Sequence, residues 1–288
     1  MGLRGILCLL CCLASVVHGT LAQASPTHKA YLSLIIDDLG QNLPRDRRVL
    51  ALPGPVTAAI MPDTPHASEF AREAHRAGKT VILHMPMDPA TGPFAWHPEL
   101  PIEELQSRLN AAFKAVPYTA GINNHMGSRM TAQREPMTWL MGELQRRHLF
   151  FVDSRTSAAT VAAAQAQDVG LAHVSRDVFL DDERTVEAIG RQLRLGVELA
   201  RRQGSAVLIG HPYPQTLQVL ERGVAGDVAV GVVLHDVKTM TLRELQQAVR
   251  AGRRQAKTRG VVEHADAHEQ LGRMRLAIAG HHVQIGAV

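Results

Sequence analysis

Two adjacent carboxylates, Asp37 and Asp38, follow the apolar segment Tyr31–Ile36. Neighbouring residues that leave a strand point in different directions, so one carboxylate can bind a metal ion while the other stays free to act as a base. The alternative is an Asp turn before Gly40. Because a turn does not require two carboxylates, we expect a chemical role for this pair.

Histidines stand at the ends of three further apolar segments. His84 follows Val81-Ile82-Leu83, His125 follows Asn123-Asn124, and His211 follows Ser205–Ile209. Imidazole combined with carboxylate is the usual ligand set for zinc or a related divalent ion. For His84 taken alone, a core histidine bonded to a backbone carbonyl is an equally good interpretation.

Another strand-end carboxylate, Asp153, follows Leu149–Val152. A buried Asp at such a position needs a cationic partner, and Arg129 or Arg155 could supply it. The segment Gly121–Arg129 is rich in side-chain donors and in glycine, which favours a functional loop over a plain polar turn. The sequence contains no Gly-rich phosphate loop and no Ser or Cys nucleophile elbow, so the pattern favours metal-assisted hydrolysis.

Short apolar segments alternate with helical patterns along the chain. The predicted strands are Tyr31–Ile36, Val56–Met61, Thr80–Met85, Ala120–Asn123, Leu149–Val152, Leu171–Val174, Ser205–Ile209 and Val230–Leu234. The predicted helices are His66–Ala77, Pro101–Val116, Pro136–Arg147, Thr185–Gln203 and Gln215–Arg222. This alternation predicts an α/β fold with a parallel sheet, and seven or eight strands favour a barrel. The carboxyl ends of parallel strands line the ligand site, which is where the Asp and His residues stand.

Residues 1–24 are typical of an export signal. Arg4 precedes an apolar run from Ile6 to Val17, and Ala22-Gln23-Ala24 fits a small-x-small cleavage site. An uncleaved anchor and a lipidated Cys12 are the less favoured alternatives. All three cysteines lie in this segment, so we expect a mature protein without disulfides, located in the periplasm or secreted. After cleavage we expect no stable membrane span.

Composition restricts the class of protein. Of 288 residues, 45% are hydrophobic and 20% are charged, which excludes a largely disordered chain. The formal net charge of +4 does not indicate a nucleic-acid-binding protein. We expect a barrel domain over residues 25–245 and a basic extension over 246–288 that forms a solvated helix and a disordered terminus. The oligomeric state does not follow from the sequence.

Taken together, these segments resemble the divergent polysaccharide deacetylases, a branch of the NodB-like carbohydrate esterases. The matching stretches are Ile35-Ile36-Asp37-Asp38-Leu39-Gly40, Leu83-His84-Met85-Pro86-Met87, Asn123-Asn124-His125-Met126-Gly127-Ser128, Phe151-Val152-Asp153-Ser154-Arg155-Thr156 and Ile209-Gly210-His211-Pro212. The resemblance runs from about Tyr31 to about Leu242. It implies a distorted (β/α)7 barrel of the NodB-like type that acts on N-acetylated sugars.

The resemblance also implies roles for single residues. Asp37 resembles the catalytic base, Asp38 and His84 resemble metal ligands, and His211 resembles the general acid. Asp153, paired with an Arg, resembles the group that orients and tunes the base. The chain departs from the family pattern in one place, because Asp88 stands where typical members carry a second metal-binding His four residues after the first.

Either His125 or Asp88 can complete the metal site. We predict that Asp38, His84 and His125 hold a divalent ion, with zinc preferred. Asp37, His211, Asp153 and Arg129 are the predicted catalytic groups, while Asn124 and Trp96 are predicted to contact an N-acetylated glycan substrate. For Trp96, packing as a hydrophobic plug is the favoured alternative. The rival functions are glycan binding or envelope assembly without catalysis, and hydrolysis of a non-sugar amide.

Overall fold

The computed structural model describes residues 30–224 and 237–239. The predicted export signal at 1–24, the basic extension at 246–288 and the predicted strand Val230–Leu234 lie outside the described residues. Among the helices of the described ranges, none has the length and apolar character needed to cross a membrane.

The sheet is parallel throughout and curls into an open barrel. Its strands are β1 (Ala30–Leu39), β2 (Val56–Ile60), β3 (Thr80–Met87), β4 (Gly121–Met126), β5 (Phe150–Asp153), β6 (His173–Ser175), β7 (Val178–Phe179), β8 (Ser205–Gly210) and β9 (Val237–Thr239). They lie in the order β6-β5-β4-β3-β2-β1-β8-β7, and β9 pairs with β1. Within the described ranges no pairing joins β6 to β7, so the barrel is incomplete there. The predicted α/β fold of the distorted (β/α)7 barrel type is confirmed.

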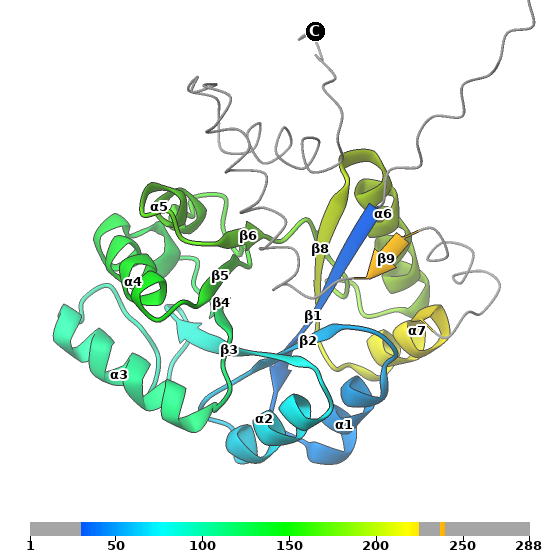
Figure 1. The fold of residues 1–288 in the computed structure, drawn as a ribbon, viewed down its shortest axis with the longest axis horizontal. Coiled ribbons are helices and arrows are strands. Elements are labelled where there is room, and N and C mark those ends of the chain that lie inside the picture. Colours follow the sequence, from blue (N-terminus) through cyan, green and yellow to red (C-terminus); the bar gives the residue numbers. More distant parts are fainter. Residues whose placement is uncertain (1–29, 225–236, 240–288) are drawn as a thin grey trace, which may run out of the picture.

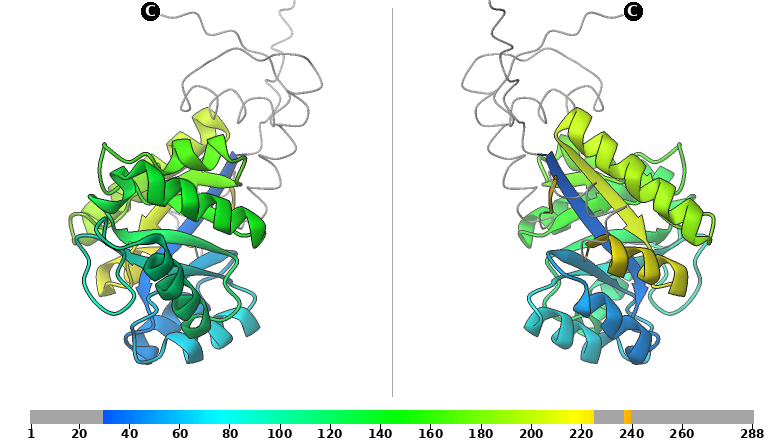
Figure 2. Two further views of the ribbon diagram at one scale, coloured as in Figure 1. Left: turned by 90° about the vertical axis from the view of Figure 1, so that its left-hand side faces the viewer. Right: turned by 90° about the vertical axis from the view of Figure 1, so that its right-hand side faces the viewer.

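Helices surround the strands on the outside of the arc (Figures 1 and 2). They are α1 (Leu43–Ala51), α2 (Ala67–Arg76), α3 (Ile102–Ala115), α4 (Arg134–Arg146), α5 (Ala162–Asp168), α6 (Val186–Gln203) and α7 (Pro214–Val224), with a short 3₁₀ turn at Met130–Ala132. Local chemistry sets the ends of α6: the Thr185 hydroxyl accepts a hydrogen bond from the Ala188 N–H, and Gly204 adopts a φ of 86° after the last turn.

Besides β9 and the short 3₁₀ turn, three described elements have no counterpart among the predicted segments, and each gives a weak signal. The helix α1 carries charged residues at four consecutive positions, Arg45 to Arg48, and this run hides its apolar face. The helix α5 is a seven-residue, Ala-rich segment without a clear period. The strand β7 has only two residues. All three are too short for a hydrophobic repeat to develop.

Alternation along the strands decides which residues face the barrel interior. Apolar residues of one parity form an inner cluster, which includes Ile35 on β1, Ile82 on β3 and Ile209 on β8. Residues of the other parity, such as Leu34, Leu83 and Leu208, pack outward against the helices. Two positions beyond the inner isoleucines stand Asp37, His84 and His211. The period of two therefore brings these three side chains to the interior at the carboxyl end of the barrel.

Candidate active site

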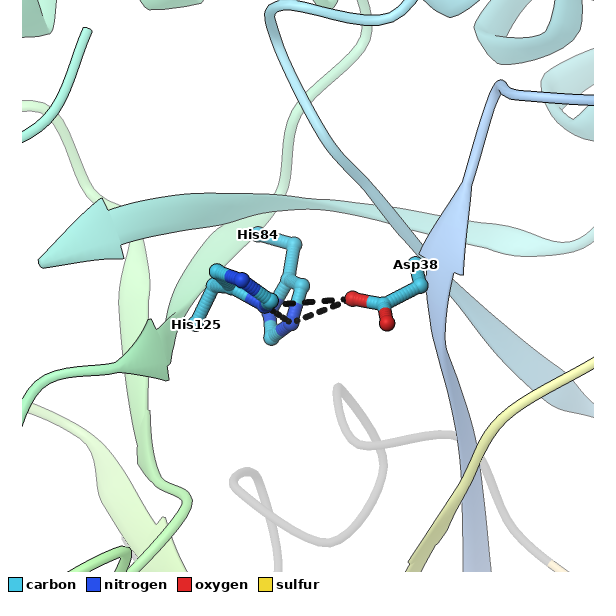
Figure 3. A group of neighbouring side chains, drawn as sticks. All are labelled: Asp38, His84 and His125. Carbon is cyan, nitrogen blue, oxygen red and sulfur yellow. Dashed lines mark hydrogen bonds and ion pairs between the residues drawn. The ribbon is translucent and has the colours of Figure 1, made fainter. Parts of the chain in front are cut away.

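Asp38, His84 and His125 converge at the carboxyl ends of β1, β3 and β4 (Figure 3). The Asp38 Oδ1 atom lies 3.3 Å from His84 Nε2 and 3.1 Å from His125 Nδ1. The two imidazole nitrogens are themselves 3.1 Å apart. The structure therefore brings together the three predicted metal ligands.

The backbone of Asp38 explains why both adjacent carboxylates reach the site. Strict alternation would turn Asp38 away from the interior that Asp37 faces. Instead Asp38 has a φ of 56°, a left-handed backbone conformation that is energetically costly for residues other than glycine. The register between β1 and β2 also shifts between Ile36 and Leu39. Gly40, with a φ of 101°, completes the turn, because a Cβ atom there would lie 2.2 Å from Thr64 Oγ1.

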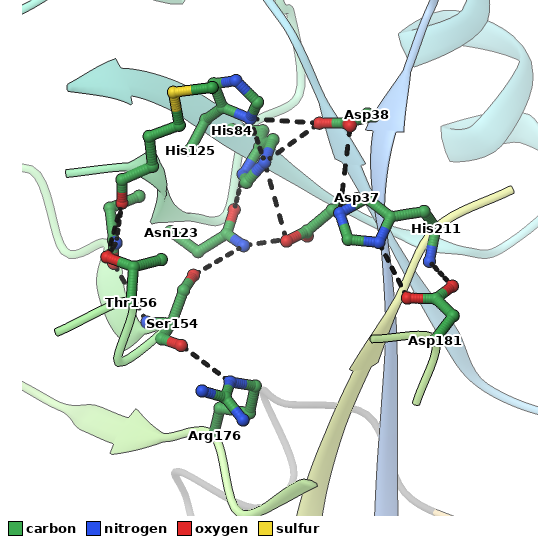
Figure 4. Close-up of polar contacts among 12 residues, drawn as sticks. Asp37, Asp38, His84, Asn123, His125, Ser154, Thr156, Arg176, Asp181 and His211 are labelled. Carbon is green, nitrogen blue, oxygen red and sulfur yellow. Dashed lines mark hydrogen bonds and ion pairs between the residues drawn. The ribbon is translucent and has the colours of Figure 1, made fainter. Parts of the chain in front are cut away.

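Asn123 fixes the orientation of the His84 ring (Figure 4). Its side-chain oxygen lies 2.9 Å from His84 Nδ1, and an amide oxygen can only accept, so Nδ1 carries the hydrogen. In the neutral ring, Nε2 then presents a lone pair toward Asp38. The Asp38 Oδ1 atom is buried and has no hydrogen-bond partner among the described residues. Lone pairs facing one another around an orphaned carboxylate oxygen fit a bound cation.

The electrostatics of the group also favour positive charge. Burial alone would raise the pKa of Asp38, but its close contacts with His125 and His84, together with the charges of His84 and His211, hold it well below its ordinary value. Burial alone would lower the pKa of His84, yet the charges of Asp37 and Asp38 raise it to about 9. Without an ion, His84 therefore keeps a proton, and a divalent cation competes with that proton for the same place.

Asp37 is buried beside the three converging groups, 3.6 Å from His84 Nε2 at its Oδ2 atom. Its Oδ1 atom accepts a hydrogen bond of 2.9 Å from the amide of Asn123. Burial raises the pKa of Asp37 above its ordinary value, against the opposing charges of His84 and His211. A carboxylate with a raised pKa is a stronger base, which is the property that proton removal from water requires.

His211 lies on the opposite side of Asp38 from the other histidines. Its Nε2 atom is 3.8 Å from Asp38 Oδ2, and its Nδ1 atom is 2.9 Å from Asp181 Oδ1. Asp181 is also held by the hydroxyl of Thr216 at 2.7 Å. Burial opposes the charged imidazole, but the hydrogen bond and charge of Asp181 raise the pKa of His211. Asp181 is a residue of this site that was not predicted from the sequence.

Asp88 does not join the metal ligands. Its carboxylate lies 3.1 Å from His97 Nδ1 and 3.0 Å from an Arg129 nitrogen. Arg129 also contacts Glu99 at 2.9 Å. Of the two cationic partners predicted for Asp153, Arg129 is excluded, because its guanidinium is already held by Asp88 and Glu99. The other, Arg155, contacts Asp153 through its backbone N–H. Of the two candidates for the last metal ligand, the structure places His125, not Asp88, beside Asp38.

Asp153 is turned away from the base. It is the residue that follows Val152, an inner residue, so alternation directs it outward. Its oxygens accept hydrogen bonds from the Arg155 N–H at 2.8 Å and from the Thr160 hydroxyl at 3.0 Å. Instead of orienting Asp37, as predicted, Asp153 fastens the loop that leads from β5 into α5.

Arg176 lies close enough to Asp37 and Asp153 for both carboxylates to act on its pKa. This residue was not predicted from the sequence. Burial lowers its pKa, and its guanidinium donates to the carbonyls of Ser154 at 2.7 Å and Arg155 at 3.0 Å. Arg176 follows β6 directly, so its place at a strand end was the available signal.

The structure buries both predicted substrate contacts, Asn124 and Trp96. Asn124 is buried, and its side chain accepts from the Ser154 N–H at 2.9 Å and donates to the Met126 carbonyl at 2.6 Å. It thereby joins the ends of β4 and β5. Trp96 is fully buried and lies against Trp139, with ring centroids 5.9 Å apart. It is the hydrophobic plug that was favoured over a sugar contact.

Comparison with known proteins identifies a family. Residues 34–241 match the model of the divergent polysaccharide deacetylases. The chain is 40% identical over 208 residues to the uncharacterized protein YibQ of Escherichia coli (strain K12). This alignment covers 71% of this chain and 65% of that protein. It is 38% identical over 197 residues to an uncharacterized protein of Haemophilus influenzae, which covers 67% of this chain and 70% of the relative.

The match with the E. coli protein spans less than two thirds of that protein's length. Among solved structures, the uncharacterized protein ATU2773 of Agrobacterium tumefaciens C58 superposes with a TM-score of 0.66 at 22% identity. That superposition covers 73% of this chain and 91% of the other. At this identity, the similarity shows a shared fold.

Proposed function

This chain belongs to the divergent polysaccharide deacetylase family, and on that premise we propose that it is a metal-dependent hydrolase that removes acetyl groups from N-acetylated sugars. The observation that carries the proposal is the convergence of Asp38, His84 and His125 beside the buried Asp37. A ligand set next to a separate base is what hydrolysis of an unactivated amide requires.

Two imidazoles and one carboxylate suit zinc, which we propose as the ion. When bound to these three residues, a divalent ion supplies Lewis acidity, which polarises the amide carbonyl and makes water easier to deprotonate. The protein contributes the orientation of the ligands: Asn123 holds His84 by its Nδ1 atom, and the left-handed backbone of Asp38 turns that carboxylate inward.

Asp37 and His211 divide the proton transfers in the proposed reaction. Asp37 takes a proton from the attacking water, aided by its raised pKa and its hydrogen bond from Asn123. His211, whose raised pKa favours the protonated ring, gives a proton to the departing amine. Its Nδ1 atom is occupied by Asp181, so Nε2 is the atom that delivers the proton. The products are acetate and a free amino sugar.

We propose that the substrate is a glycan of the cell envelope. This part of the proposal depends on the export signal predicted over residues 1–24, which would direct the chain to the periplasm or the exterior. The rival is a glycan-binding or envelope-assembly protein that uses the same barrel without turnover. Acetate release separates these two functions.

The test is acetate release from N-acetylated oligosaccharides by the zinc-loaded full chain. We expect release by the wild type and a loss of about 10²–10⁴-fold in kcat for Asp37→Asn, which removes the base but keeps its shape. Asp168→Asn is a matched control, because Asp168 is exposed at the last residue of α5. Sugar binding without acetate release by the wild type would overturn the proposal in favour of the binding protein.

A further inference from the structure

Arg184 and Tyr213 form a fixed pair next to His211. The Arg184 guanidinium carbon lies 3.9 Å from the centroid of the Tyr213 ring, and its Nη2 atom donates a 2.7 Å hydrogen bond to the Tyr213 hydroxyl. The Tyr213 ring in turn lies 5.3 Å from the ring of His211, centroid to centroid. An otherwise flexible arginine is thus held in one orientation close to the proposed general acid.

The pairing leaves the charge of Arg184 uncompensated by direct contact. Its side chain is exposed, and among the described residues it forms no ion pair with a carboxylate. The neighbouring Glu183 is directed to Arg191 instead, at 3.6 Å. Arg129, by contrast, is held by both Asp88 and Glu99. An oriented guanidinium with free N–H donors is the group that binds carboxylates and phosphates best.

The proposed reaction fixes which part of a substrate would meet this pair. His211 gives its proton to the departing amine, so the sugar that carries the amine must lie on the His211 side of Asp38. The Tyr213 ring contacts His211, and Arg184 stacks on Tyr213. A substituent of that sugar, or of the residue next to it, therefore comes within reach of the guanidinium.

We propose that Arg184, oriented by Tyr213, forms an anion subsite, and that the sugar recognised here carries a carboxylate or a phosphate near its acetamide. This inference rests on the proposed function for the placement of the sugar. It narrows the substrate class from N-acetylated sugars in general to acidic ones. Tyr213 is a positioning residue, because its ring and hydroxyl hold Arg184 and it has no proposed contact with the substrate.

The test measures binding of three sugars to the zinc-loaded full chain by calorimetry. N-acetylglucosamine is neutral, N-acetylmuramic acid adds a carboxylate, and N-acetylglucosamine 1-phosphate adds a phosphate. We expect at least one acid to bind about tenfold more tightly than the neutral sugar, and the preferred acid identifies the anion. Arg184→Gln should abolish this preference, and Tyr213→Phe, which keeps the stacked ring but loses the hydroxyl, should reduce it.

The control is Arg194→Gln, which removes the same charge from an exposed position on α6 and should keep the preference. A wild type without preference for either acid, or an Arg184→Gln variant that retains it, would overturn the subsite. Acetate release is scored separately on a neutral oligosaccharide. A preference for an acidic sugar without acetate release would support the subsite and contradict the proposed function. Acetate release without such a preference would support the proposed function and contradict the subsite. Failure of all three sugars to bind would count against both.

Discussion

At the scale of single residues, the two sides of Asp38 have different surroundings. His84 is held by the neutral amide of Asn123, whereas His211 is held by the carboxylate of Asp181. Both partners fix the orientation of the ring that they contact. The carboxylate of Asp181 also stabilises the protonated ring of His211, which is the state that a general acid needs.

The pH profile should report this difference. His211 must be protonated to act as the acid, so activity falls as the pH rises through its pKa, which Asp181 raises. Asp181→Asn removes that effect and should move the alkaline limb of kcat/KM to lower pH. The acid limb, which we assign to Asp37, should stay in place. Asp182→Asn, an exposed neighbour, is the control, and an unchanged alkaline limb in Asp181→Asn would refute the assignment.

Residue types at strand ends were sufficient to predict Asp37, Asp38, His84, His125 and His211 as one site, and the structure brings them together. The sequence was less informative about pairing between loops. Arg129 pairs with Asp88 and Glu99, which lie on other loops, and no local pattern contains that information. For Trp96, only the tertiary fold decides between a sugar contact and the hydrophobic plug, which the structure shows.

At the scale of elements, α1 supports the turn that presents Asp38. The carboxylate of Asp46 in α1 is fully buried, and its Oδ2 atom accepts from the N–H groups of Gly40 at 2.8 Å and Asn42 at 3.2 Å. Its Oδ1 atom accepts from Arg45 Nε at 2.7 Å. A helix that follows the first strand therefore holds the backbone of the metal-binding turn.

Removing this carboxylate should weaken both the fold and the site. Asp46→Ala leaves two backbone donors without their acceptor, at a cost of about 1–3 kcal/mol in the free energy of unfolding. Zinc affinity should fall as well, because the turn of Asp38 loses its anchor. Asp46→Asn keeps one oxygen for the two N–H groups and should recover most of the zinc affinity. Tight zinc binding by Asp46→Ala would show that the turn holds itself.

The elements that sequence analysis missed are the ones with little periodicity. The helices α2, α3, α4, α6 and α7 follow predicted helical segments, with boundaries that differ by at most two residues. The charged run in α1 and the two-residue strand β7 gave no such signal. Because α1 was not predicted, its role in holding the turn of Asp38 could not be predicted either.

At the scale of the whole molecule, the inner apolar cluster packs directly below the residues of the site. Ile82 is fully buried in this cluster, two residues before His84 on the same face of β3. Ile82→Ala should lower the free energy of unfolding by about 2–5 kcal/mol, measured by denaturant titration. Leu195→Ala, at a position 41% exposed on α6, should stay within about 0.5 kcal/mol of the wild type. Equal stability of the two variants would argue against a tightly packed interior.

Alternating strand and helix signals were enough to predict the barrel, because a parallel sheet needs a crossover between successive strands. Its incomplete closure between β6 and β7 was not predicted, since the pairing of edge strands depends on contacts far apart in the chain.

The proposed metal centre depends on the identity of its three ligands. The direct measurement is the number of zinc ions that the purified full chain retains after gel filtration. We expect about one ion per chain for the wild type and for Asp88→Ala, and a loss of the ion in Asp38→Ala and His125→Ala. Retention of zinc by His125→Ala together with its loss from Asp88→Ala, or an unchanged zinc content in Asp38→Ala, would contradict the proposed metal centre.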